Sequence, residues 1–132
     1  MGAAFALSSA EMAAESERIG TLSNRLRDGL LALPGVSLNG CPNQRIPHTL
    51  NLCIEHKGFT SASLASGLAL STTSACNSAS NKPSHVLIAL GLTPAQAGSS
   101  IRISLGRYTE VADVDKAVEV IRQALAAPAA FW

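Results

Sequence analysis

The chain has 132 residues, of which 47% are hydrophobic and 14% are charged, and its formal net charge is +1. This length and composition predict one domain with a packed core rather than a disordered chain. The ten Lys and Arg residues form no basic stripe, and every apolar run is far shorter than the roughly 20 residues of a membrane span, so neither nucleic-acid binding nor a membrane role is expected.

The first predicted element is a long amphipathic helix over residues 1–34. Apolar residues recur every seven positions along it, with two leucines filling the stripe between them, and Pro34-Gly35 should end it. The stripe consists of Phe5, Met12, Ile19, Leu22, Leu26, Leu30 and Leu33. We therefore expect this face of the helix to cover the core.

Three short strands are expected, and apolar residues alternate with other residues in each of them. They are residues 36–38, 50–54 and 101–105. In the second strand the alternation turns Asn51 and Cys53 away from the core, and in the third it does the same for Arg102 and Ser104.

The remaining elements are predicted to be helices or loops. Helices are expected at residues 61–69, capped by Thr60, at residues 83–90, starting with Pro83, in the capping box from Thr93 to Gln96, and after Thr109. The last helix should bury Val111, Val114, Val118, Ile121 and Leu125, and the residues after it should fray. Helices around short strands predict an α+β fold with a small, mainly antiparallel sheet covered by helices, in one domain over residues 1–132.

Residues 73–82 are small and polar and show no apolar period, so they are predicted to form a mobile loop. Cys76 lies in this loop, upstream of a predicted helix start, and exposure near a helix N-terminus favours the reactive thiolate. Cys41 and Cys53 are interpreted as a loop thiol and a packed thiol. Three cysteines at wide spacing indicate no disulfide framework and no metal site, so a reducing cytoplasm is expected.

The segments that carry a family resemblance follow in order along the second half of the chain. They are Ser74-Ala75-Cys76-Asn77-Ser78-Ala79-Ser80, Pro83-Ser84-His85-Val86-Leu87, Ala89-Leu90-Gly91-Leu92 and Ser99-Ser100-Ile101-Arg102-Ile103-Ser104-Leu105-Gly106-Arg107-Tyr108-Thr109. In order and spacing they resemble the C-terminal region of the cysteine desulfurases, which are pyridoxal phosphate enzymes of the class V aminotransferase group. A weaker similarity continues upstream, so the resemblance covers nearly the whole chain.

The resemblance implies the C-terminal small domain of a fold-type I pyridoxal phosphate enzyme. At the matching position, Cys76 would attack the sulfur of L-cysteine and leave L-alanine and a persulfide. Arg102 would bind the substrate carboxylate, and its guanidinium offers the two parallel donors that this needs. Arg107 is a weaker candidate of the same kind that would line a domain junction, and His48, His56 and His85 are interpreted as ordinary loop or surface histidines.

The chain departs from the family pattern in several places. It holds no Ser-His-Lys motif for the cofactor, and its lysines are Lys57, Lys82 and Lys116. We therefore expect a fragment that lacks the large cofactor-binding domain, binds no pyridoxal phosphate by itself and is inactive alone. Thr73 and Asn77 also differ from the residues common in the family's cysteine loop.

The resemblance further implies a set of partners. They are the large pyridoxal phosphate domain of the same protein, a second subunit in a homodimer, a sulfur-acceptor protein and L-cysteine. The final pathway, iron-sulfur cluster assembly or thiolation, stays open. Two alternatives also stay open: a non-catalytic persulfide carrier or dimerisation module, and the domain of a related pyridoxal phosphate lyase or aminotransferase.

Overall fold

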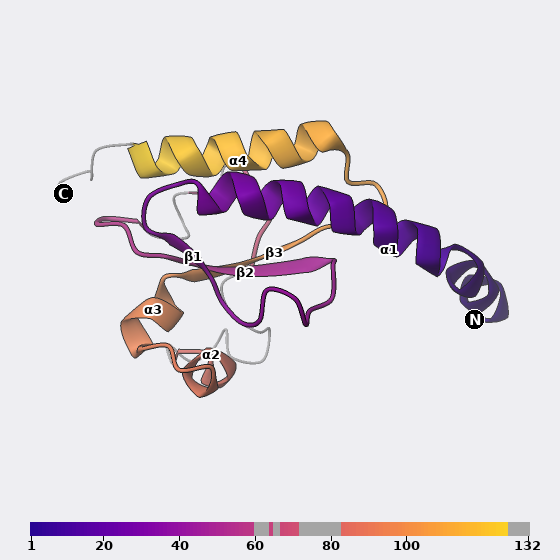
Figure 1. Ribbon diagram of the computed structural model, residues 1–132, viewed down its shortest axis with the longest axis horizontal. Coiled ribbons are helices and arrows are strands. Elements are labelled where there is room, and N and C mark those ends of the chain that lie inside the picture. Colours follow the sequence, from indigo (N-terminus) through magenta and orange to yellow (C-terminus); the bar gives the residue numbers. More distant parts are fainter. Residues whose placement is uncertain (60–63, 65–66, 72–82, 127–132) are drawn as a thin grey trace.

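The computed structural model describes residues 1–59, 64, 67–71 and 83–126. Within them, an antiparallel sheet of order β1-β2-β3 lies between helices (Figure 1). The strands are β1 (Val36–Leu38), β2 (Thr49–Ile54) and β3 (Ser100–Ser104), and the helices are α1 (Gly2–Leu31), α2 (His85–Ala89), α3 (Pro94–Gly98) and α4 (Val111–Ala126). The predicted α+β fold with an antiparallel sheet is confirmed.

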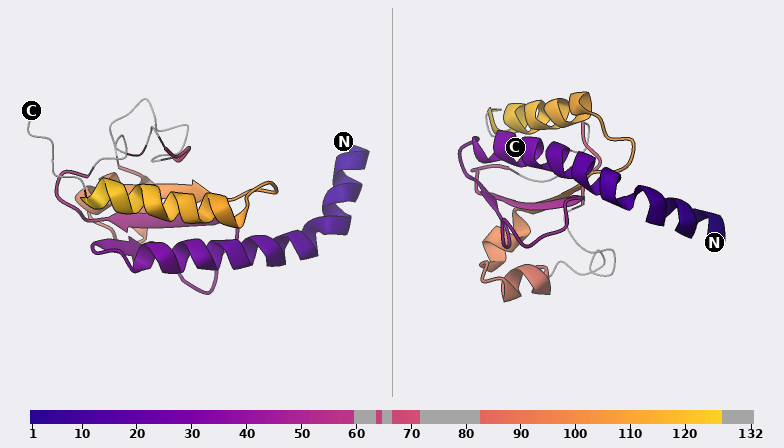
Figure 2. Two further views of the ribbon diagram at one scale, coloured as in Figure 1. Left: turned by 90° about the horizontal axis from the view of Figure 1, so that it is seen from above. Right: turned by 45° about the vertical axis from the view of Figure 1, so that its right-hand side comes forward.

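The sheet has two faces with different cover. Helices α1 and α4 lie side by side over one face, and α2 and α3 lie on the opposite side (Figures 1 and 2). The apolar residues of β2 and β3 point toward α1 and α4 and form one buried cluster with them. Its most buried members are Ile19, Leu26, Leu30, Leu50, Leu52, Ile54, Leu64, Ile101 and Ile121. The alternation of the two strands is therefore confirmed.

The two halves of α1 differ in burial. Ile19 and Leu26 are buried in the core, whereas Phe5 is 80% exposed and Met12 is 64% exposed. The helix extends past the sheet, and its first turns bend away from the rest of the helix (Figure 2). The prediction that the whole stripe faces the core is thus wrong for the first half, because in the described part of the chain no element lies beneath that half.

The turn after α1 requires a glycine. The helix ends at Leu31, three residues earlier than predicted, and Gly35 adopts a φ of +77°. A Cβ atom at Gly35 would lie 2.5 Å from the backbone oxygen of Glu55, so a side chain would clash as well as strain the backbone. This close approach brings β1 against β2.

The short helices beyond the cysteine loop are confirmed with one correction. The capping box is present, since the Gln96 N–H donates to Thr93 Oγ1 at 3.2 Å and the Thr93 N–H donates to Gln96 Oε1 at 3.0 Å. Helix α2 has Ser84 as its N-cap, so Pro83 precedes the helix instead of opening it.

The start of α4 also differs from the prediction. Thr109 does not cap the helix, because its Oγ1 accepts the N–H of Gly106 at 2.9 Å and closes the turn after β3. Asp113 instead accepts the N–H of Glu110 at 2.9 Å. Val111 is 50% exposed, so its predicted place in the core is wrong, whereas Val114 is buried as predicted. The rest of the predicted stripe packs on or in the core, as Val118, Ile121 and Leu125.

Some predicted elements cannot be compared with the structure. Most of the helix predicted at residues 61–69 lies outside the described residues, as do the whole cysteine loop at 73–82 and residues 127–132. Leu64 is fully buried, which agrees with an apolar face in the first of these segments. Ser71 is bridged to β3, which agrees with the extended segment expected near it.

Candidate functional site

Four polar residues form a row across the sheet on the face opposite α1 and α4. Asn51 pairs with Arg102 in the register of β2 and β3, and an isolated bridge pairs Arg102 with Ser71. On the other side, the Asn39 N–H donates to the Asn51 backbone oxygen at 2.9 Å. Because residues that face each other in adjacent strands project to the same side of a sheet, these four residues share one face. We call them the polar row.

The bridge at the end of the row connects β3 to the segment that leads to Cys76. The Ser71 N–H donates to the Arg102 oxygen at 3.1 Å, and the Arg102 N–H donates to the Ser71 oxygen at 2.7 Å. Cys76 itself lies outside the described residues, five positions after Ser71. A chain of that length spans at most about 17 Å, at roughly 3.4 Å per residue. The backbone therefore limits the Cα atom of Cys76 to that distance from Ser71, which is hydrogen-bonded to Arg102.

Arg102 is exposed, whereas its neighbours Ile101 and Ile103 are buried in the core. The orientation predicted from the alternation of β3 is therefore confirmed. An exposed guanidinium on a regular strand keeps its donors available for a planar anion such as a carboxylate. The role of Arg102 as a substrate ligand remains a prediction.

Buried hydrogen bonds hold the other end of the row. Asn39 is 8% exposed and Ser100 is 2% exposed. Asn39 Nδ2 donates to Asn51 Oδ1 at 2.7 Å and to Ser100 Oγ at 3.0 Å, and Ser100 Oγ donates to the Gln96 backbone oxygen at 2.8 Å. Sequence reasoning missed this network. The only signal for it was the position of Asn51 on the face away from the core.

The other two cysteines occupy the places predicted for them. Cys53 is buried, and its Sγ lies 3.5 Å from the Gln96 backbone oxygen. Cys41 is exposed in the loop after β1, where backbone N–H groups of Asn43 and Gln44 donate to its sulfur. These hydrogen bonds lower the pKa of the Cys41 thiol from its usual value, and the positive charge of Arg45 adds to the effect.

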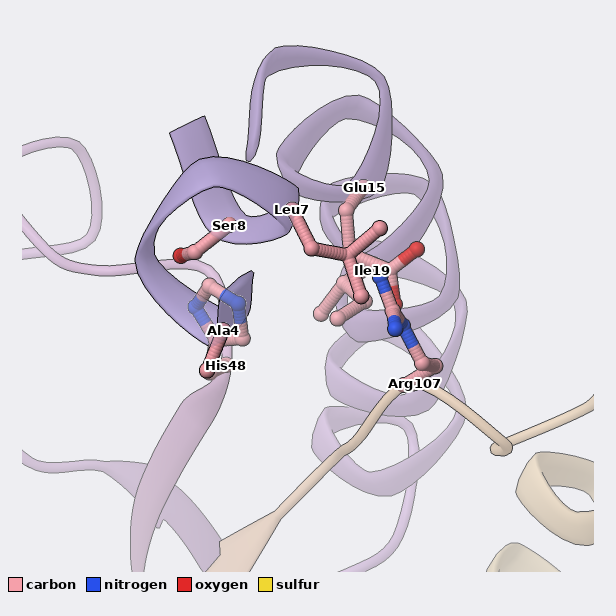
Figure 3. A pocket seen from close by; sticks show the side chains of 7 residues that line it. All are labelled: Ala4, Leu7, Ser8, Glu15, Ile19, His48 and Arg107. Carbon is pink, nitrogen blue, oxygen red and sulfur yellow. The ribbon is translucent and has the colours of Figure 1, made fainter. Parts of the chain in front are cut away.

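Arg107 lies apart from the polar row. Its guanidinium forms an ion pair with Glu11 of α1. Together with His48 it lines a hollow against the first turns of α1, where Ala4, Leu7, Ser8, Glu15 and Ile19 complete the wall (Figure 3). The structure therefore brings Arg107 to α1, and its place at a junction with another domain remains a prediction.

The described residues do not fit a covalent pyridoxal phosphate site. Lys57 is exposed in the turn after β2, and Lys116 is exposed on α4, which covers the opposite face of the sheet from the polar row. Lys82 lies outside the described residues. Among the residues that the structure describes, no group of three or more His, Cys, Asp or Glu side chains could hold a metal ion.

No helix in the described ranges is both long enough and apolar enough to cross a membrane.

The family model for aminotransferase class V matches residues 1–117. The chain belongs to this family. Cysteine desulfurase IscS of Methylococcus capsulatus is 47% identical over 127 residues, which cover 96% of this chain and 32% of that protein. Cysteine desulfurase IscS of Vibrio cholerae is 44% identical over 126 residues, which cover 95% of this chain and 31% of that protein.

Two solved structures share the fold. A NifS-like protein from Rickettsia africae superposes with a TM-score of 0.78 and 25% identity, over 96% of this chain and 33% of that one. Another NifS-like protein superposes with a TM-score of 0.73 and 26% identity, over 91% of this chain and 30% of that one. The chain thus spans about a third of the length of these relatives.

Proposed function

We propose that the chain is the C-terminal small domain of a pyridoxal phosphate-dependent cysteine desulfurase, with Cys76 as sulfur acceptor and Arg102 as ligand of the substrate carboxylate. The sequence identity to two cysteine desulfurases supports this type of reaction. The observation that carries the residue assignment is the pair of backbone hydrogen bonds between Ser71 and Arg102. It ties the segment that leads to the thiol directly to the strand that carries the guanidinium.

The proposed transfer converts L-cysteine to L-alanine. The Cys76 thiolate attacks the substrate sulfur, so that an S–S bond forms and the Cβ–S bond of the substrate breaks. The electron pair of that bond remains on the carbon, which takes up a proton and completes L-alanine, while Cys76 keeps the sulfur as a persulfide. Pyridoxal phosphate belongs to the large domain in this proposal, and no residue of this chain is assigned to hold it.

Arg102 would orient the substrate during this transfer. A guanidinium binds a carboxylate through two parallel N–H donors, which fixes the direction of the bound amino acid as well as its position. A substrate held in one orientation keeps its sulfur in the position from which the thiolate can attack. This lowers the entropic part of the activation barrier.

The proposed partners follow from the same assignment. The exposed first half of α1, with Phe5 and Met12, continues the buried stripe of the second half, so we assign it to contact with the large domain. A homodimer and a sulfur-acceptor protein of iron-sulfur cluster or thiolation pathways complete the assembly. A reducing cytoplasm suits a reactive thiol and two further free cysteines.

The test is a chimaera in which this chain replaces the matching C-terminal third of the Methylococcus capsulatus relative. With a thiol added to reduce the Cys76 persulfide, we expect it to form L-alanine and sulfide from L-cysteine, and Cys76→Ala to abolish sulfide release while cofactor absorbance is retained. Arg102→Lys should raise KM for L-cysteine about tenfold, because a lysine cannot bind the carboxylate through two parallel donors. Cys41→Ala is the matched control and should retain activity. Full activity of Cys76→Ala would contradict the assignment.

A second candidate is a persulfide carrier without chemistry of its own, or a dimerisation module. A carrier of this kind needs no lysine to hold pyridoxal phosphate, and neither described lysine joins the polar row. Mass spectrometry of the isolated chain after treatment with a persulfide donor would show one added sulfur on Cys76 if the chain is a carrier. A domain of a related lyase or aminotransferase is disfavoured by the Ser-Ala-Cys segment, because a transaminase has no use for the thiol of Cys76.

A further inference from the structure

The hydrogen bonds at the buried end of the polar row have a single consistent direction. The backbone oxygen of Gln96 can only accept, and the Ser100 hydroxyl donates its one proton to it at 2.8 Å, beside the Ser99 hydroxyl at 3.2 Å. Ser100 Oγ is therefore left as an acceptor, and the atom that approaches it at 3.0 Å must be the NH₂ nitrogen of Asn39. With the Ser100 proton used in this way, the Asn39 amide turns its NH₂ group toward Ser100.

The direction continues from Asn39 to Asn51. The second proton on Asn39 Nδ2 is donated to Asn51 Oδ1 at 2.7 Å. In the described part of the chain this is the side-chain hydrogen bond that Asn51 makes, and it occupies the amide oxygen. The oxygen thus faces β1, and the NH₂ group of Asn51 is the end available on the side of β3, where Arg102 is the cross-strand neighbour.

We propose that Asn51 is a second carboxylate-binding residue beside Arg102, and that Asn39 is the positioning residue that turns its NH₂ group toward the ligand. The inference rests on the proposed function, because it assigns a further donor to the substrate carboxylate at that same site. Two carboxylate oxygens offer about four acceptor positions. The guanidinium fills two of them, and the Asn51 NH₂ group supplies a third donor from the adjacent strand.

Burial makes this orientation hard to reverse. If the Asn39 amide turned over, its oxygen would face two atoms that already act as acceptors, Asn51 Oδ1 and Ser100 Oγ. Asn39 is 8% exposed and Ser100 is 2% exposed, so water is poorly placed to compensate. The network therefore presents donors to the row, and donors are what an anionic ligand requires.

The experiment follows side-chain N–H resonances of the ¹⁵N-labelled chain during titration with L-alanine, a carboxylate that lacks the reactive sulfur. We expect the Arg102 Nε–H and the Asn51 NH₂ resonances to shift together with one dissociation constant, and alaninamide to leave both unchanged. Asn51→Leu should weaken L-alanine binding about tenfold, the loss expected for one hydrogen bond to a charged group.

Asn39→Asp tests the positioning role. The introduced carboxylate can only accept, so Asn51 would turn its NH₂ group toward β1, and binding should weaken about as much as in Asn51→Leu. Protonation of the introduced carboxylate at lower pH restores a donor and should restore part of the binding, which a general loss of structure would not do. Asn43→Asp, with the same charge change in the exposed loop after β1, is the control and should bind as the unmodified chain does.

The outcomes separate this inference from the proposed function. A shift at Arg102 without one at Asn51 would overturn the inference and leave the function standing. If neither resonance shifts, the inference fails, and the KM of Arg102→Lys in the chimaera decides separately whether Arg102 binds the substrate. Unchanged binding by a folded Asn39→Asp variant would remove the positioning role alone. Should that variant not fold, Asn51→Leu decides the question, since Asn51 is only partly buried.

Discussion

The two faces of strands β2 and β3 are made by alternate residues of the same two segments, yet they serve different functions. On one face Leu52 and Ile101 lie in an apolar core beneath α1 and α4. On the other face Asn51 and Arg102 lie side by side in the polar row. The comparison shows how a small domain can separate the two tasks: burial of apolar surface stabilises the fold, and the hydrogen-bonded face is left free to present donors.

The largest effect should come from the apolar face. Leu52 is fully buried in the central strand, so Leu52→Ala should lower the free energy of unfolding by about 3 kcal/mol through lost burial and a cavity. Val111→Ala is the matched control, because Val111 is 50% exposed and the change should stay within about 0.5 kcal/mol. Urea denaturation measures both. Equal losses would show that Val111 contributes to the core after all.

A smaller effect should follow from the polar face. Ser100→Ala removes the hydroxyl that joins Asn39 to the Gln96 carbonyl and leaves a buried donor unpaired, so we expect a loss of about 1–2 kcal/mol. Ser104→Ala, an exposed serine on the same strand, should be nearly neutral. If urea denaturation cannot distinguish the two variants, the polar face would contribute nothing to the stability of the fold.

A third comparison concerns the turn after β3, which connects the sheet to α4. Arg18 of α1 donates to the backbone oxygens of Arg107 at 2.6 Å and Thr109 at 2.8 Å, and so joins the first helix to the turn after β3. Arg18→Met should cost about 1 kcal/mol. In contrast, Arg122 pairs within α4 with Glu119, and Arg122→Met should cost only about 0.3 kcal/mol. Thermal unfolding should preserve this order, and a reversed order would contradict the role of Arg18.

The smallest expected effect concerns pH. Arg25 of α1 holds Asp115 of α4 through two hydrogen bonds of 2.7 and 2.9 Å, and these lower the pKa of Asp115 below its usual value of 3.8. Because the folded pKa is depressed, the stabilisation is present above about pH 4 and is lost as the pH falls through the folded pKa. Arg25→Gln should therefore flatten the acid limb of the stability curve. Both side chains are exposed, so added salt should do the same, and an unchanged acid limb would contradict the pairing.

Much of the fold was predictable from local pattern. The alternation in β2 and β3 identified their buried faces, and the Thr93 to Gln96 spacing identified a capping box, because both depend on residues within one turn or one strand. The start of α4 could not be predicted in this way. Thr109 and Asp113 both carry a side-chain oxygen that can accept an N–H group of the turn or of the helix start, and the local pattern does not distinguish them. The structure uses Thr109 for the turn and Asp113 for the first N–H of the helix region.

The candidate site shows the same division. The sequence alone determined that Arg102 faces away from the core and that Cys76 follows an extended segment, because side-chain direction in a strand depends only on its period of two. The tertiary structure decided that Ser71 pairs with Arg102 and that Asn39, Asn51 and Ser100 share hydrogen bonds. These contacts join residues that are 12 to 61 positions apart in the sequence, and only the register of the strands brings such residues together.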